Sequence, residues 1–175
     1  MQGQYFALSF IHFTFGVHIE ILNKMNRLDD AFFQRDVLDL APLLLGKTIV
    51  RKFDDSSESR FLITETEAYK GEEDLACHAS KGRTPRTEVM YQPGGCLYVY
   101  LIYGMYWMLN IVTGEKDNPQ AVLIRGLDAV YGPGRLTKKL QIDKSFNGER
   151  LQTSERIYLL NNDLKCDYSV APRVG

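Results

Sequence analysis

Two spacings of hydrophobic residues alternate along the chain and predict a mixture of helices and strands. Segments rich in β-branched and aromatic residues predict strands at residues 48–53, 61–69, 96–102, 106–113, 121–125 and 157–160. Helical spacing is found at residues 37–46 and 134–140 and in a short segment capped by Asp29 or Asp30. We expect Gly46 to close the helix at 37–46, with Pro42 in its first turn or between two turns.

The connections between these segments favour a sheet in which successive strands form hairpins. Residues 54–58 are polar and predict a turn between two strands, whereas residues 70–96 are rich in Gly and Pro and predict loops. Tyr103, Gly104 and Met105 separate two strands and predict a tight hairpin with an aromatic residue at its tip. We therefore predict one α+β domain, built on a mostly antiparallel sheet flanked by helices.

The first 25 residues do not share this pattern and are treated as an extension of uncertain structure, so the domain itself spans residues 26–175. Their apolar run from Tyr5 to Leu22 lacks a basic start and a cleavage site of small residues. His12, His18 and Glu20 interrupt the run. A signal peptide and a membrane-spanning helix are both poor fits to this segment.

The composition of the chain limits how a nucleic acid could bind and whether a disulfide framework or a metal site is expected. The chain has 175 residues and a formal net charge of −1, so a nucleic-acid partner would have to bind a local basic patch. Residues 79–90 and 125–150 each carry a local excess of Lys and Arg. The three cysteines form no C-x-x-C pair and the three histidines no cluster, which favours neither a disulfide framework nor a metal site.

Glu65 and Glu67 lie two residues apart in the strand predicted at 61–69, so their side chains share one face with Tyr69. The same alternation puts Phe61 and Ile63 on that face, where a carboxylate is costly unless it is paired or functional. A solvated strand face is the alternative. A glycoside hydrolase with paired carboxylates is a third possibility, although neighbours on one strand face rarely lie on both sides of a sugar.

The segment from Tyr98 to Asn110 holds four tyrosines and one tryptophan. Most such aromatics are core residues of strands, and Tyr98 and Tyr100 share one face. Tyr103 has little to pack against at a hairpin tip and is a candidate for insertion between base pairs. Asn110 interrupts an apolar strand, and its amide could bind either the backbone or the edge of a base.

His78 and Arg125 are further candidates whose spacing leaves their roles open. A single histidine is more often a hydrogen-bonded structural residue than a ligand contact. Arg125 ends the apolar run AVLIR, which indicates an acidic partner nearby, in a structural or a catalytic pair.

Taken together, the longer motifs of the chain resemble the alkyladenine (3-methyladenine) DNA glycosylase family, from about residue 27 to the end. These motifs are RLDDAFFQRDVLDLAPLLLGK, TETEAYKGEEDLACHA, GRTPRTEVMYQPGGCLYVYLIYGMYWMLNIV, AVLIRGL, GPGRLTKKL and APRVG. The resemblance implies a curved antiparallel sheet with a protruding hairpin. It also implies a monofunctional enzyme that flips alkylated or deaminated purines out of duplex DNA and hydrolyses the N-glycosidic bond.

The resemblance also implies roles for individual residues. Glu67 matches the base that activates water, and Arg125 the arginine that helps to hold that water. The residues that match contacts to the flipped base are Tyr69, His78, Tyr100 and Asn110, and Tyr103 matches the residue that fills the gap in the duplex. Glu65 matches no assigned role. No metal and no cofactor are implied.

The implied partner is double-stranded DNA that contains a damaged purine. The resemblance also implies that the protein acts as a monomer and that no membrane is involved. The implied location is the bacterial cytoplasm at the nucleoid, or the nucleus of a eukaryote. Two departures leave an alternative open, a lesion-binding protein of the same fold with impaired catalysis. The stretch from Arg125 to Gly132 is shorter than is usual, and the chain stops at Gly175 where relatives continue into a further strand.

Overall fold

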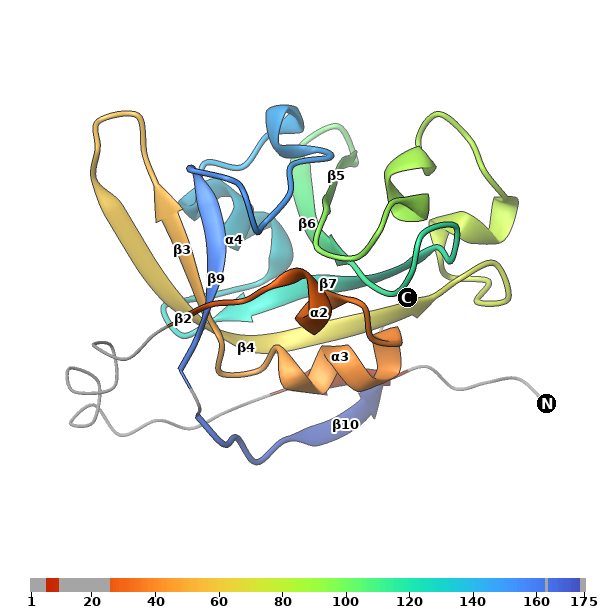
Figure 1. Cartoon of the computed structure of the whole chain (residues 1–175), viewed down its shortest axis with the longest axis horizontal. Coiled ribbons are helices and arrows are strands. Elements are labelled where there is room, and N and C mark those ends of the chain that lie inside the picture. The colour runs from red at the N-terminus through yellow and green to blue at the C-terminus, as the bar shows by residue number, and fades with distance from the viewer. Residues whose placement is uncertain (1–5, 10–25, 163, 174–175) are drawn as a thin grey trace.

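The computed structural model describes residues 6–9, 26–162 and 164–173 of the chain (Figure 1). A sheet of ten strands passes through the described residues, with the order β2-β9-β3-β4-β7-β6-β5 and with β1, β8 and β10 beside this path. Every strand pair is antiparallel. The predicted α+β class with a mostly antiparallel sheet is therefore confirmed.

The strands predicted from the sequence are present, with small shifts at their ends. They are β3 (Thr48–Lys52), β4 (Glu58–Lys70), β5 (Leu97–Ile102), β6 (Tyr106–Val112), β7 (Gln120–Leu127) and β9 (Ile157–Asn161). Four strands were not predicted, namely β1 (Phe6–Ser9), β2 (Asn26–Arg27), β8 (Val130–Tyr131) and β10 (Ser169–Pro172). The segment at residues 157–160 is the last strand that the sequence predicts, and this is wrong as the end of the sheet, because β10 follows it.

The described α-helices are short, and each begins at a residue type that favours a helix start, Asp at the N-cap or Pro in the first turn. They are α2 (Asp30–Phe33), α3 (Val37–Leu43) and α4 (Pro133–Lys139), with 3-10 turns η2 (His78–Lys81), η3 (Glu88–Tyr91) and η4 (Lys144–Phe146). Asp29 caps α2 by accepting a hydrogen bond from the Phe32 amide at 2.9 Å, which confirms one of the two predicted caps. Among the described residues, no helix is long and apolar enough to cross a membrane.

The end of α3 differs from the prediction. The helix stops at Leu43 rather than at Gly46, and Pro42 lies in its last turn. The chain then turns at Gly46, whose φ of 75° suits glycine, and the Gly46 amide donates to the Ile63 carbonyl at 2.7 Å. This hydrogen bond joins the end of α3 to β4, the strand that carries the two glutamates.

The sheet has two covered faces. Its main core contains residues of α3, α4 and the central strands, such as Leu40, Leu109, Ile124 and Leu136. A smaller cluster on the other face contains Cys77, Ala79, Met90, Cys96, Tyr98, Val112 and Ala121. Alternation along the central strands separates the two sets, because consecutive side chains of a strand point to opposite faces.

A β-bulge in β4 shifts this alternation. The pairing of β4 with β7 is irregular between Ile63 and Thr66. Ile63 and Ala68 consequently both join the main core, although one is an odd and the other an even position. The expectation that Phe61 and Ile63 share one face with Glu67 and Tyr69 is therefore wrong. The bulge puts Glu67 and Tyr69 on the face opposite to that of Phe61 and Ile63.

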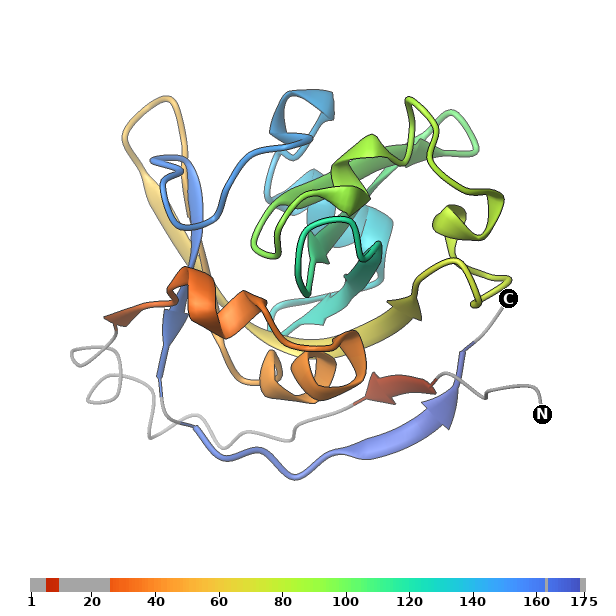
Figure 2. The ribbon, with the colours of Figure 1, turned by 45° about the vertical axis from the view of Figure 1, so that its right-hand side comes forward.

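Strand β1 lies between β4 and β10 at the edge of the sheet (Figure 2). It pairs with residues 65–67 of β4 on one side and with residues 169–172 of β10 on the other. Four residues of the predicted N-terminal extension thus form part of the sheet, and the division of the chain at residue 26 remains a prediction.

Candidate active site

The second face of the sheet carries a row of predicted site residues. Glu67 of β4 pairs with Leu123 of β7, Leu123 with Asn110 of β6, and Asn110 with Tyr98 of β5. Paired residues of antiparallel strands point to the same side, so this register aligns the carboxylate, the amide and the phenol across four strands. The position of Arg125 two residues beyond Leu123 puts its side chain on the same face.

A pocket of about 190 Å³ opens on this face. Its lining residues are Tyr69, Ala76, Cys77, His78, Met90, Tyr98, Tyr100, Ile102, Asn110 and Ala121. The lining therefore includes all four residues predicted to contact a base, namely Tyr69, His78, Tyr100 and Asn110. Aromatic walls with a few polar groups are typical of a site that binds a flat ring.

Three aromatic residues of the lining, His78, Tyr98 and Tyr100, form one cluster. The ring centroids of His78 and Tyr100 lie 4.6 Å apart, and those of Tyr98 and Tyr100 lie 5.2 Å apart. The Nδ1 atom of His78 and the hydroxyl of Tyr98 share a hydrogen bond of 2.9 Å. Burial, helped by the cations Arg86 and Lys81, lowers the pKa of His78, which keeps the imidazole neutral near neutral pH.

The opposite wall is Tyr69, which connects the pocket to Glu67. The Tyr69 hydroxyl donates to Glu67 Oε2 at 2.9 Å. Burial and the neighbouring Glu67 charge raise the pKa of Tyr69 well above its usual range, so the phenol stays protonated and remains a donor. Burial and Tyr98 likewise raise the pKa of Tyr100 to about 12.

Glu67 is a buried carboxylate, with only 1% of its surface exposed. Its Oε2 atom accepts from Tyr69 and also from the Arg125 Nη1 atom, which lies 3.3 Å away. Its Oε1 atom is buried and has no hydrogen-bond partner among the described residues. An unpaired buried carboxylate oxygen is costly, and a donor such as water fits this position.

Arg125 joins the two glutamates. Its Nε atom donates to Glu65 Oε1 at 3.1 Å, and its Nη1 atom donates to Glu67. Burial opposes the charge of the guanidinium, but the two carboxylates outweigh it and raise the pKa of Arg125. Glu65 therefore neutralises and orients the arginine that contacts Glu67.

Tyr103 lies at the tip of the β5–β6 hairpin and is 82% exposed. Its φ of 53° is unusual for an aromatic residue and reflects the tight turn. Asn110, in contrast, is buried at the floor of the pocket and donates through Nδ2 to the Tyr98 carbonyl at 3.0 Å. The β5–β6 hairpin thus contributes Tyr98, Tyr100, Ile102 and Asn110 to the pocket and carries an exposed aromatic residue at its tip.

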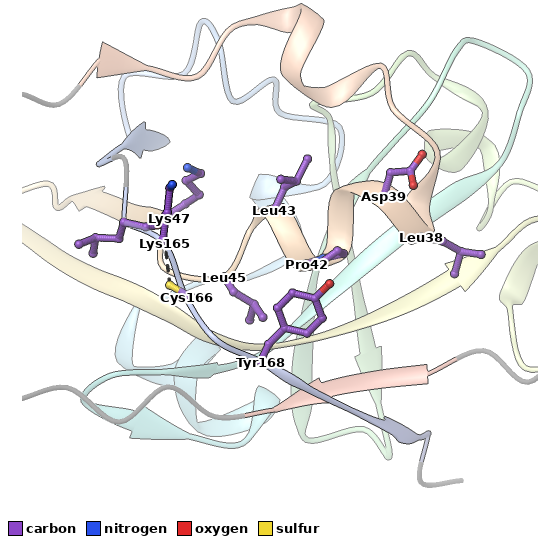
Figure 3. Close-up of a pocket in the computed structure, with 10 residues that line it drawn as sticks. Leu38, Asp39, Pro42, Leu43, Leu45, Lys47, Lys165, Cys166 and Tyr168 are labelled. Atoms are coloured by element: carbon purple, nitrogen blue, oxygen red, sulfur yellow. Dashed lines mark hydrogen bonds between the residues drawn. The ribbon is translucent and has the colours of Figure 1, made fainter.

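A larger hollow of about 580 Å³ lies elsewhere, between α3 and residues 164–168 (Figure 3). Its lining residues are Leu38, Asp39, Pro42, Leu43, Leu45, Lys47, Leu164, Lys165, Cys166 and Tyr168. None of the predicted site residues lines it. In the described part of the chain, no group of three His, Cys, Asp or Glu side chains could hold a metal ion.

The model of the methylpurine-DNA glycosylase family matches residues 31–131. A relative from Sodalis glossinidius, with "3-methyladenine DNA glycosylase" in its name, is 45% identical over 155 residues, which cover 85% of this chain and 88% of the relative. A relative from Legionella pneumophila with the same words in its name is 42% identical and covers 86% of each chain. The chain belongs to the methylpurine-DNA glycosylase family.

Membership of this family makes the chain a DNA glycosylase, a hydrolase of N-glycosidic bonds whose partner is DNA. The matched residues 31–131 include every predicted site residue, from Glu67 and Tyr69 in β4 to Arg125 in β7. The matched range also contains every described residue that lines the pocket.

Reasoning from the sequence assigns no role to three residues in or beside this candidate site. The sequence identifies Tyr98 only as sharing a strand face with Tyr100, and Glu65 matches no assigned role of the family. Arg173 follows β10 and contacts both Tyr69 and Asp74. The APRVG motif was a signal for Arg173, but nothing in its spacing indicates a contact with residues about a hundred positions earlier.

Proposed function

We propose that this glycosylase flips an alkylated or deaminated purine out of duplex DNA into the pocket and hydrolyses its bond to deoxyribose. The bases of this class include 3-methyladenine, 7-methylguanine and hypoxanthine. One observation carries the proposal. Glu67 is a buried carboxylate with one oxygen held by Tyr69 and Arg125 and the other without a partner among the described residues, next to an aromatic pocket.

In the proposed mechanism, Glu67 Oε1 accepts a hydrogen bond from the attacking water. The bond between C1′ and the purine nitrogen breaks, and its electron pair leaves with the base. Water attacks C1′ and gives one proton to the Glu67 carboxylate, which also stabilises the positive charge that develops on the sugar. A cationic alkylated base leaves as a neutral purine, whereas a neutral base takes up a proton from its surroundings.

The base itself would lie between the Tyr69 ring and the cluster of His78 and Tyr100. Aromatic stacking contributes about 1–3 kcal/mol per base in proteins that bind single strands. Electron-rich tyrosine rings also attract a positively charged base. Asn110 lies on the floor of the pocket, where its amide can contact the edge of the purine and disfavour the exocyclic amine of normal guanine.

The proposed product is an abasic site in an unbroken strand. No lysine is present among the described residues that line the pocket, so a covalent imine with the sugar has no amine to form it. The enzyme is proposed to act as a monomer on duplex DNA, with Tyr103 filling the space that the flipped nucleotide leaves.

A duplex oligonucleotide with one hypoxanthine, and a second with one 7-methylguanine, test the proposal. The wild-type enzyme is expected to release the base and leave an abasic site that alkali, but not the enzyme, converts to a strand break. Glu67→Gln is expected to lower the single-turnover rate by about 100-fold or more, because the amide cannot take the proton from water.

Binding of Glu67→Gln to the lesion duplex serves as the control and should remain close to that of the wild type. Full activity in this variant would show that Glu67 is not the base. Tight binding of the wild type to both duplexes without release of either base would favour the lesion-binding alternative instead.

A further inference from the structure

We propose that Arg173 is a positioning residue that holds two walls of the base pocket and biases the pocket toward neutral rather than cationic bases. The proposal rests on the proposed function of the pocket. Arg173 is far from Glu67 in sequence and follows β10, which β1 connects to β4. Its side chain is nevertheless largely buried, with 11% of its surface exposed.

The first contact of Arg173 is a bidentate ion pair with Asp74. Nη1 lies 2.7 Å from Asp74 Oδ2, and Nη2 lies 2.7 Å from Oδ1. Asp74 is itself only 2% exposed. A planar guanidinium that meets both oxygens of a buried carboxylate fixes orientation as well as distance, which lysine cannot do.

Asp74 in turn organises the loop that leads to His78. Its carboxylate accepts from the Lys70 amide at 3.0 Å and from the Ala76 amide at 3.2 Å. Its carbonyl accepts from the Cys77 amide at 2.8 Å. Because Ala76, Cys77 and His78 all line the pocket, the ion pair with Arg173 anchors one entire wall.

The second contact of Arg173 is with the opposite wall. Its guanidinium carbon lies 4.6 Å from the centre of the Tyr69 ring, and its Nη1 atom donates to the Ala68 carbonyl at 2.9 Å. Tyr69 lines the pocket whereas Arg173 lies outside the lining. One guanidinium thus fixes the ring that would stack on the base and whose hydroxyl holds Glu67.

The charge of Arg173 affects the preference of the pocket between neutral and cationic bases. A cation already lies against the π system of Tyr69, so a cationic base stacked on that ring would add a second positive charge to it. A neutral base carries no such penalty.

Three variants test the proposal on the hypoxanthine and 7-methylguanine duplexes, with single-turnover rates and melting temperatures measured for each. Arg173→Met removes the charge and the ion pair, and Arg173→Lys keeps the charge but loses the bidentate contact. Arg60→Met is the control, because Arg60 forms an exposed pair with Glu58 on the β3–β4 hairpin.

We expect Arg173→Met to lower the hypoxanthine rate by about tenfold. Its 7-methylguanine rate should fall severalfold less, so that the ratio of the two rates shifts toward the cationic base. Arg173→Lys is expected to lower both rates while it keeps the wild-type ratio, and Arg60→Met to change neither. A ratio of rates that follows the charge at position 173 distinguishes the proposed role from a merely structural one, since partial unfolding lowers both activities equally.

Equal losses on both bases in Arg173→Met, or wild-type rates in that variant, would overturn the role of Arg173. If Arg173→Met unfolds, the ratio measured with Arg173→Lys decides, because a shift there despite the retained charge contradicts the proposal. Failure of the proposed function is distinguishable from these outcomes, since it would appear as a wild-type enzyme that releases neither base.

Discussion

At the scale of single residues, two glutamates of identical chemistry acquire different environments. Glu67 is 1% exposed and bound by Tyr69 and Arg125, whereas the Glu65 side chain is 23% exposed and bound by Arg125. The difference follows from their neighbours, because only Glu67 is in register with the row that leads to the pocket. In the proposed mechanism, Glu65 therefore orients Arg125 and is not a second catalytic carboxylate.

This difference predicts a graded effect of substitution. Glu65→Gln removes one charge from the pair that orients Arg125, so we expect a loss in single-turnover rate of about tenfold. The loss should be clearly smaller than that of Glu67→Gln in the same assay. A loss in Glu65→Gln as large as that of Glu67→Gln would contradict the assignment of separate roles.

The ion pair of Asp74 predicts a dependence of stability on pH. Burial disfavours the Asp74 charge, but the hydrogen bonds from Arg173 and the backbone outweigh it and lower the pKa of the carboxyl below its usual value. The unfolded chain therefore binds a proton more readily than the folded one as the pH falls. The stabilisation is complete well above about pH 4 and is lost as the pH falls through the folded pKa.

Melting temperatures of the wild type and Asp74→Asn across this range provide the measurement. The wild type should be the more stable at neutral pH, since breaking a buried pair costs about 3–5 kcal/mol. The two curves should approach each other below about pH 4. Parallel curves over the whole range would show that Asp74 does not carry the predicted stabilisation.

At the scale of elements, the β5–β6 hairpin joins two parts of the proposed function. The side chains of Tyr98 and Tyr100 in β5 lie on the second face of the sheet, where they line the pocket. Tyr103 lies exposed at the tip of the same hairpin. The distance between pocket and tip is thereby fixed by the regular rise of one strand. In the proposed mechanism, a nucleotide that enters the pocket would leave a gap in the duplex near Tyr103.

Substitution of the tip therefore predicts a loss of binding without a loss of stability. Tyr103→Ala removes an exposed ring, so the melting temperature should change little. The Kd for a lesion duplex should rise by about tenfold, in line with the loss of one stacking contact. Unchanged binding in this variant would argue against insertion of Tyr103 into the duplex.

At the scale of the whole molecule, the formal net charge of the chain is −1. DNA is a polyanion, so local groups of Lys and Arg side chains have to bind its phosphates. Several arginines of the two basic segments have acidic partners: Arg83 pairs with Glu88 and Asp117, Arg125 with both glutamates, and Arg150 with Asp30. Arg135, in contrast, is exposed near the start of α4, next to Gly134, which packs against Tyr106 of the hairpin.

This distribution predicts that Arg135 contacts a phosphate beside the hairpin. Arg135→Gln should reduce the slope of log Kd against log salt concentration by about one, with little change in the preference for the lesion. Arg60→Gln, on the β3–β4 hairpin, is the matched control and should leave the slope unchanged. Equal slopes for Arg135→Gln and the wild type would place the phosphate contacts elsewhere.

The sequence by itself determined six of the ten strands in the described sheet, because alternation and β-branched residues indicate them, and the motifs from TETEAY to AVLIRGL indicated the family. It also identified Glu67, Tyr69 and Arg125 as candidates. It did not determine the bulge in β4, since one unpaired residue leaves little trace in a hydrophobic pattern.

Only the tertiary structure decided how the candidates meet. The register across β4, β7, β6 and β5 aligns Glu67 with Asn110 and Tyr98, and register is a property of pairs of strands rather than of either strand alone. The contacts of Arg173 with Tyr69 and Asp74 likewise join positions far apart in the chain. Local propensity carries no information about such pairs, because their free energy arises only when the folded sheet brings them together.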